Sequence, residues 1–299
     1  MPELPDIMAY IDALRPRVMN QALLDIHISS PFLLRSVDPP VADAIGREVT
    51  NIRRLGKRIV LGVEGDIFII IHLMIAGRFH WKEGRVKPNR KTLAAFDFPL
   101  GTLTLTEAGS KRRASMYLVR GESGLSAHDP GGLEVLEADL GSFQDALVSE
   151  NHTLKRALTD PNLFSGIGNA YSDEILHMAG LSPLQLTKRL DDEQVARLYE
   201  AVLATLLLWS EKLRKEAKDG FPEKVTAFRD DMAVHGRYGK PCPKCGTPVQ
   251  RIVYAENEAN YCPTCQTGGR LLADRAMSRL LKDDWPRTVE ELERKRGRG

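Results

Sequence analysis

Two C-x-x-C pairs hold all four cysteines of this 299-residue chain. Cys242 and Cys245 form the first pair, and Cys262 and Cys265 form the second. Each pair can offer two thiolates to one ion, and four thiolates complete the tetrahedron of a structural zinc site. A disulfide framework would spread its cysteines over the fold, and a thioredoxin-type redox site needs one pair beside a βαβ unit. The spacing therefore predicts one zinc ion per chain, with no open position for a catalytic water.

The segment between the cysteine pairs predicts a β-hairpin with residues 250–254 as one strand. Such hairpins often contact nucleic acid, but a zinc-binding module that only stabilises the fold has the same sequence pattern. The finger alone does not decide between these two functions.

The rest of the chain changes from a strand pattern to a helix pattern. A helix is expected over residues 6–20, with Pro5 suited to its first turn. Short β-rich runs separated by Gly, Pro, Asp and Asn follow at residues 23–29, 48–55, 58–65, 66–75, 93–98, 101–107 and 115–121. Helical patterns then cover residues 136–150, 152–160, 169–180 and 191–217.

These patterns predict an α+β protein. We expect an N-terminal β-sandwich with a leading helix over residues 1–129, a helical domain over 130–238, a zinc-finger hairpin over 239–269 and a charged extension over 270–299.

The net charge of +2 does not by itself indicate a polyanion as partner. The basic residues nevertheless gather in three clusters, which solvated loops or a nucleic-acid face would both explain. No apolar run is long enough to span a bilayer, and the acidic, amphipathic start lacks the form of a signal peptide. We therefore expect no membrane association and a cytoplasmic location.

Residues 165–169, Ser-Gly-Ile-Gly-Asn, form a glycine-punctuated turn before a predicted helix. Free N–H groups at a helix N-terminus suit a phosphate, and glycine allows close approach. Plain capping by Asn169 and ordinary helix packing fit the same pattern.

The N-terminus places Pro2 and Glu3 before the first helix. If Met1 is removed, Pro2 carries a free amine that titrates near pH ~8, so a useful fraction is neutral and nucleophilic. Such an amine attacks an aldehyde-like carbon to give a Schiff base, and Glu3 can move a proton beside it. A rigid proline that merely orders the terminus is the alternative.

MPELPD at the start, SGIGNAYSDE in the middle and a four-cysteine finger at the end occur in this order. With these motifs, the chain resembles the formamidopyrimidine-DNA glycosylase / endonuclease VIII family over residues 1–269. The resemblance implies a bifunctional DNA glycosylase and AP lyase of base-excision repair that acts on damaged, chiefly oxidised, bases. It also implies a monomer that binds damaged double-stranded DNA at the nucleoid of a bacterial-type cell.

The family's catalytic roles carry over to four residues. The resemblance assigns the attack on C1′ to Pro2 and the proton at the sugar ring to Glu3. It assigns a phosphate contact that assists catalysis to Lys57. Asp6 stands where relatives usually have Glu, and it is expected to position the terminal amine or cap the helix.

The DNA contacts carry over to the loops and the finger. The resemblance makes residues 130–238 a helix–two-turn–helix domain, which holds phosphate through Lys155, Gly168 and Asn169. A flipped-out base leaves a gap that an inserted side chain fills, and Ile75 is the best-placed apolar wedge. Further candidates for DNA contact are His72, Lys91, Arg112, Arg113, Arg251 and Asn257.

Three departures from the family pattern concern function. Besides Asp6, Ala114 replaces an aromatic residue after the arginines, and Asn257 replaces a finger arginine that contacts the lesion phosphate and supports δ-elimination. The balance of β- and β,δ-elimination and the preferred lesion therefore stay open. A non-catalytic binder of damaged DNA, and an AP lyase with little base excision, are the alternative functions.

Overall fold

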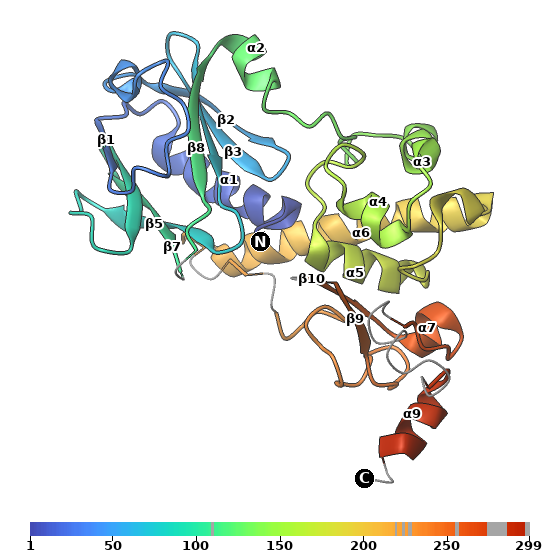
Figure 1. The fold of residues 1–299 in the computed structure, drawn as a ribbon. Coiled ribbons are helices and arrows are strands. Elements are labelled where there is room, and N and C mark those ends of the chain that lie inside the picture. Colours follow the sequence, from blue (N-terminus) through green and yellow to red (C-terminus); the bar gives the residue numbers. More distant parts are fainter. Residues whose placement is uncertain are drawn as a thin grey trace. The chain divides into compact units, whose positions relative to one another are not determined.

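The computed structural model describes residues 1–108, 111–218, 220–222, 225–226, 229–254, 257–273 and 286–296, without the side chains of residues 254, 257, 293 and 296. The chain divides into two compact units, and Figure 1 shows their helices and strands. The β-rich unit comprises residues 1–132 and 207–227, and the helix–finger unit comprises residues 133–206 and 228–299.

Helix α1 (Leu4–Val18) opens the β-rich unit. Pro5 lies in its first turn, where the missing N–H costs nothing. The helix begins two residues before the predicted start. Its buried face carries Ile7, Tyr10, Ile11 and Leu14 into the core.

Two four-stranded antiparallel sheets follow, in the strand orders β2-β3-β4-β8 and β1-β6-β7-β5. Their inward-facing side chains, together with α1, form one hydrophobic core, as the sandwich prediction requires. The strands are β1 (Asp25–Ile28), β2 (Val49–Leu55), β3 (Arg58–Val63), β4 (Ile67–His72), β5 (Gly77–Glu83), β6 (Thr92–Phe98), β7 (Gly101–Glu107) and β8 (Ser115–Arg120).

The sequence prediction missed β5 and the short helix α2 (Gly121–Ser126). Strand β5 alternates polar and apolar residues, with Phe79 in the core, so a period of two was its available signal. Helix α2 places Leu125 on a second, smaller cluster with Val60, Phe68 and Ile70, on the opposite face of the β2–β3–β4–β8 sheet.

The helix–finger unit contains α3 (Leu140–Ser149), α4 (Leu154–Thr159), α5 (Asn169–Ala179) and the first part of α6 (Asp192–Ala217). These confirm the predicted helices to within a few residues at most ends. Phe143 packs against Phe164 and Tyr199, with ring centroids 5.0 and 5.4 Å apart. Gly180 ends α5 in the left-handed conformation, with φ of 65°. The described chain also contains two 3₁₀ turns, η1 (Val41–Ala44) and η2 (Thr187–Arg189).

The cysteine module contains the hairpin β9 (Gln250–Tyr254) and β10 (Asn257–Tyr261), followed by α7 (Pro263–Thr267). Strand β10 packs against α5, and Figure 1 shows the two side by side. Beyond the finger, the backbone N–H of Leu271 donates to the carbonyl of Arg287, and α9 (Val289–Arg296) follows. None of the helices in the described residues has the length and apolar character needed to cross a membrane.

Candidate functional site

The start of α1 holds two buried carboxylates in a fixed arrangement. Glu3 is the N-cap residue, and its side chain accepts the backbone N–H of Asp6. In return, the backbone N–H of Glu3 donates to Asp6 Oδ2 at 2.9 Å. This reciprocal capping box leaves Glu3 1% and Asp6 0% exposed. The shorter aspartate thus reaches the backbone of Glu3, so Asp6 caps the helix and orients the residues before it.

Lys57 lies beside these carboxylates, in the tight turn between β2 and β3. Burial lowers its pKa below the ordinary value of 10.5, and the nearby charge of Glu3 only partly offsets this effect. The structure gives its ammonium no hydrogen bond or ion pair with the described residues. A half-buried ammonium without a hydrogen bond of its own suits an external anion.

The N-terminal amine belongs to the same cluster. Met1 is present, so its amino group stands in for the amine that Pro2 would carry after removal of Met1. Burial lowers the pKa of this amine below its ordinary value of 8.0, and the charges of Arg78 and Lys57 act in the same direction. Glu3 and Asp6 oppose the shift without cancelling it. These surroundings hold the pKa of the Met1 amine below its ordinary value.

His72, at the end of β4, extends this cluster. Burial, followed by the charges of Arg58 and Lys57, lowers the pKa of His72 to about 4. The neutral ring accepts the backbone N–H of Met74 at its Nδ1, at 2.9 Å. It thereby fixes the start of the turn that carries Ile75.

The turn from Leu73 to Gly77 presents one apolar side chain to solvent. The backbone N–H of Gly77 donates to the carbonyl of Leu73 at 2.9 Å, and a Cβ on Gly77 would lie 2.2 Å from that oxygen. Only glycine therefore closes this turn. Ile75, at its tip, is 55% exposed.

A basic loop follows β7. The buried carboxylate of Glu107 accepts the backbone N–H groups of Arg113 and Ala114 at 2.8 and 3.0 Å. Arg112 donates to the carbonyl of Arg90 at 3.3 Å, which joins this loop to the one that carries Lys91. The side chains of Lys91, Arg112 and Arg113 are exposed, whereas Ala114 is buried.

In the helix–finger unit, the predicted phosphate residues meet at the start of α5. Gly168 is the N-cap, and Asn169 is the first helical residue and is partly exposed. Lys155 points inward. Its Nζ donates to Asn169 O at 2.6 Å, Ser172 Oγ at 2.8 Å and Asp173 Oδ1 at 2.5 Å. Because an ammonium has three N–H groups, all of them are committed within the unit.

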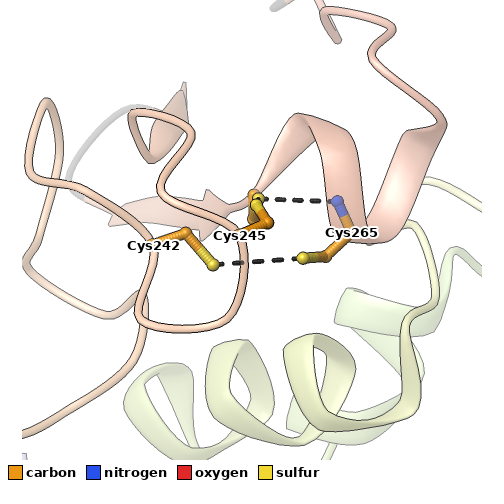
Figure 2. Close-up of side chains that lie close together, drawn as sticks. Cys242, Cys245 and Cys265 are labelled. Atoms are coloured by element: carbon orange, nitrogen blue, oxygen red, sulfur yellow. Dashed lines mark hydrogen bonds between the residues drawn. The ribbon is translucent and has the colours of Figure 1, made fainter.

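The four cysteines come together as the spacing predicts, with Sγ atoms all within 4.8 Å of one another. Figure 2 shows the side chains of Cys242, Cys245 and Cys265 gathered between the finger loop and its helix. Thiolates at ~2.3 Å from a tetrahedral zinc ion lie about 3.8 Å apart. The Sγ separations of 4.0 Å for Cys242–Cys265 and 3.4 Å for Cys245–Cys262 bracket that value. The donor set therefore fits one structural Zn²⁺. His177 of α5 lies 3.2 Å from Cys242 Sγ through its Nε2.

Arg251 lies on β9 and is held on two sides. It pairs with Glu258 of β10 at 3.2 Å, and its guanidinium carbon lies 4.5 Å from the ring centroid of Tyr238. Asn257 begins β10, but its side chain lies outside the described residues.

Sequence reasoning missed the buried polar residues around α5. Asp173, His235 and Asn260 are 0%, 4% and 1% exposed, respectively. Glu174 is also buried and accepts backbone N–H groups of residues 233–235. The two adjacent acids Asp173 and Glu174 within one predicted helix were the one available signal, since acids that become buried require partners.

Models of three domains match the chain in order. They are the formamidopyrimidine-DNA glycosylase N-terminal domain over residues 1–115, the formamidopyrimidine-DNA glycosylase H2TH domain over 132–212, and a zinc finger found in FPG and IleRS over 239–268. The last match and the cysteine geometry together support the structural zinc ion.

Similar proteins extend these matches over most of the chain. A formamidopyrimidine-DNA glycosylase of Thermus thermophilus is 33% identical over 287 residues, covering 90% of this chain and 100% of the relative. A formamidopyrimidine-DNA glycosylase-like protein of Mycobacterium tuberculosis is 42% identical over 153 residues, covering 51% of this chain and 93% of that protein.

Solved structures show the same fold. The MutM (FPG) protein of Thermus thermophilus superimposes with a TM-score of 0.73 at 31% identity, covering 89% of this chain and 98% of that one. A Lactococcus lactis Fpg, in a complex with DNA containing an abasic site, superimposes with a TM-score of 0.76 at 22% identity, covering 89% and 99%.

Proposed function

Since the chain belongs to the formamidopyrimidine-DNA glycosylase family, we propose that it excises damaged bases from double-stranded DNA and then cleaves the abasic site through a Schiff base on Pro2. The family makes it a DNA glycosylase of base-excision repair. The lyase step, the nucleophile and the DNA contacts are proposals that the following geometry supports.

One observation carries the proposal: where α1 begins, the terminal amine and the ammonium of Lys57 lie close to the carboxylate of Glu3, and this ammonium has no hydrogen bond among the described residues. Once Met1 is removed, the neutral amine of Pro2 attacks C1′, the bond from C1′ to the base breaks, and the base leaves with the proton that the amine gives up. Glu3 gives a proton to the ring oxygen O4′, and the sugar opens to an iminium. Loss of a C2′ proton with departure of the 3′ phosphate is then β-elimination, and water releases the protein.

Lys57 supplies the phosphate contact in this proposal. Its ammonium has no internal counter-ion within hydrogen-bonding reach among the described residues, so a DNA phosphate would relieve the cost of its burial. A cation at this point also stabilises charge that develops on the leaving phosphate. A chain that only bound DNA would not need this arrangement beside a terminal amine.

Ile75 is proposed as the wedge that fills the gap left by the flipped base. Its tight turn and exposed side chain match this task. Arg112, Arg113, Lys91 and His72 belong to the basic loops and to the base of the wedge turn, where they would contact the backbone of the opened duplex. Because Ala114 is small and buried, the insert is smaller than in relatives that carry an aromatic residue.

At the second proposed phosphate contact, the start of α5 and the side chain of Asn169 bind the anion. Lys155 has a different role from the direct contact that the resemblance implies. Its three N–H groups are already used, so we assign it to the positioning of Asn169. In the finger, Arg251 is proposed to replace the positive charge that Asn257 does not provide.

The test uses protein whose Met1 removal has been verified by mass spectrometry. Duplexes carrying one oxidised purine, one oxidised pyrimidine or one abasic site are incubated with wild type and Pro2→Gly. Gels run with and without alkali separate base release from strand cleavage. We expect wild type to cleave at a lesion and at the abasic site, and Pro2→Gly to cleave neither. Binding without cleavage would support a damaged-DNA binder, and cleavage of the abasic site alone would support a lyase.

A further inference from the structure

A single buried carboxylate joins three separate parts of the helix–finger unit. Asp173 of α5 is fully buried, and its Oδ1 accepts Lys155 Nζ of α4 at 2.5 Å. Its Oδ2 lies 2.8 Å from His235 Nδ1 and accepts Asn260 Nδ2 of β10 at 3.2 Å. These four side chains, Lys155, Asp173, His235 and Asn260, form the Asp173 network.

One end of the Asp173 network reaches the first turn of α5. Lys155 donates not only to Asp173 but also to Asn169 O and Ser172 Oγ, and Ser172 Oγ donates to Gly168 O at 2.6 Å. These bonds fix the backbone of the residue that carries the proposed phosphate-binding amide. The position of Asn169 therefore depends on where Asp173 holds the ammonium.

The other end of the network reaches the zinc module. Asn260 lies two residues before Cys262, on the strand that leads into the second cysteine pair. His235 lies in a segment that Glu174 secures through the backbone N–H groups of Ala233, Val234 and His235, at 2.7 to 2.9 Å. The finger and the phosphate-binding turn are thus connected through a single acid.

Stability alone is a weak reason for this arrangement. Apolar side chains of similar volume often stabilise a core as well as a buried ion pair does, while ionic networks have their best-attested use in setting register. A network that ends on the backbone of Asn169 fits that second use.

We propose that Asp173 and His235 are positioning residues that hold Asn169 in its phosphate-binding position and make that position depend on the folded zinc finger. The inference rests on the proposed role of Asn169. Asp173 and His235 act through Lys155 and need not touch DNA themselves.

The test compares two replacements of His235. His235→Phe removes the donor to Asp173, whereas His235→Asn keeps an N–H in the place of Nδ1. The measured quantity is the Kd for a duplex that carries a tetrahydrofuran abasic-site analogue, in the wild-type and Asn169→Ala backgrounds. In the wild-type background we expect His235→Phe to weaken binding about 3- to 30-fold. In the Asn169→Ala background we expect a loss of about twofold or less, because the effects of residues that act through one another are not additive. His235→Asn is expected to bind within about twofold of wild type, since a donor remains.

Leu198→Ala is the control for general destabilisation, because Leu198 is a fully buried residue of α6 in the same unit and its apolar side chain forms no polar link to the network. It should lower the melting temperature and leave the Kd unchanged below the transition. An equal loss of affinity from His235→Phe in both backgrounds, or a loss with Leu198→Ala that matches it, would overturn the inference.

A second measurement needs no DNA. The amide of Ser172, which donates to Gly168 O at 3.1 Å, reports on the first turn of α5 by hydrogen exchange. We expect faster exchange in His235→Phe, and wild-type exchange in His235→Asn. If Asn169→Ala does not weaken DNA binding, the proposed phosphate role of Asn169 fails, and this exchange result then decides the network separately. Unchanged exchange in His235→Phe would refute the positioning role.

Discussion

Two partly buried lysines, one in each unit, differ in their hydrogen bonds and therefore in their roles. Lys155 is 11% exposed and gives all three of its N–H groups to acceptors inside the helix–finger unit. Lys57 is half-buried in the β-rich unit, and the structure gives it no hydrogen bond among the described residues. Its pKa is lowered by burial. The first lysine completes a structure, and the second keeps its charge available for a ligand.

Burial of Lys155 therefore concerns the stability of the fold, whereas burial of Lys57 concerns the proposed function. A buried charge with partners is costly to remove, because its acceptors are then left unpaired. A buried charge without hydrogen-bond acceptors weakens the fold slightly, and such strain is typical of functional sites. Substitutions of the two lysines should therefore affect different measurements.

Lys155→Met should produce the largest loss of stability. The change leaves Asp173 buried without its main counter-ion, at a cost of about 3–5 kcal/mol in the free energy of unfolding. Denaturant unfolding of the zinc-loaded protein measures it. A loss under about 1 kcal/mol would mean that the ion pair is not held as the structure shows.

Lys57→Met should mainly reduce catalysis. Without the cation at the proposed phosphate, cleavage of abasic-site DNA should slow by about 10²- to 10³-fold, as for the removal of one preorganised charge contact. Its free energy of unfolding should be unchanged or slightly higher, because a desolvated charge has been removed. Lys57→Arg, which keeps the charge, serves as the control. Equal loss of stability in Lys57→Met and Lys155→Met would break the comparison.

Asp6→Ala should have a smaller effect of mixed kind. The capping box loses its second hydrogen bond, which costs about 1 kcal/mol of stability. The residues before α1 lose their fixed orientation, so the cleavage rate should fall as well. Asp6→Glu tests whether a longer acidic side chain, unlike alanine, keeps both the stability and the cleavage rate of the wild type. Recovery of stability without recovery of rate would show that the reach of the Asp6 side chain matters for the amine.

The smallest predicted effect concerns His72 and acid. The pKa of His72 is about 4 in the folded protein and ordinarily 6.5. Between these pH values His72 is protonated in the unfolded chain but neutral in the folded protein. Protonation therefore stabilises the unfolded chain, and the free energy of unfolding decreases as the pH falls from 6.5 toward 4. His72→Asn keeps an acceptor for Met74 and removes the titration. Unfolding midpoints at about pH 7 and about pH 5 should therefore differ less in the variant than in wild type, and an equal difference would contradict the assignment.

Local patterns were sufficient to predict most of the fold. The cysteine pairs predicted the finger and its β9 strand, and alternating or apolar runs between turn residues predicted seven of the eight strands of the β-rich unit. Strand β5 was missed. The run predicted over residues 66–75 extended beyond β4 into the turn from Leu73 to Gly77, so no separate strand was predicted after that turn. Gly77 closes that turn through a contact with the backbone of Leu73, a feature that only three-dimensional structure reveals.

The sequence motifs predicted which residues belong to the candidate site. They did not predict the roles that depend on tertiary packing. The motifs marked both Lys57 and Lys155 as phosphate contacts. Nothing near Lys155 in the sequence indicates that Asp173, eighteen positions away, neutralises it. His235 and Asn260 come from distant segments, so their link to Asp173 depends on tertiary contacts without a local signature.

The central claim is that the amine of Pro2, and not a lysine, forms the bond to DNA. The most direct measurement is borohydride reduction of a mixture of Met1-processed protein and abasic-site DNA, followed by digestion and mass spectrometry of the adduct peptide. The account predicts a single reduced adduct on the peptide that begins at Pro2, present in Lys57→Met at reduced yield and absent in Pro2→Gly. An adduct located on Lys57, or no adduct despite tight binding of the DNA, would contradict it.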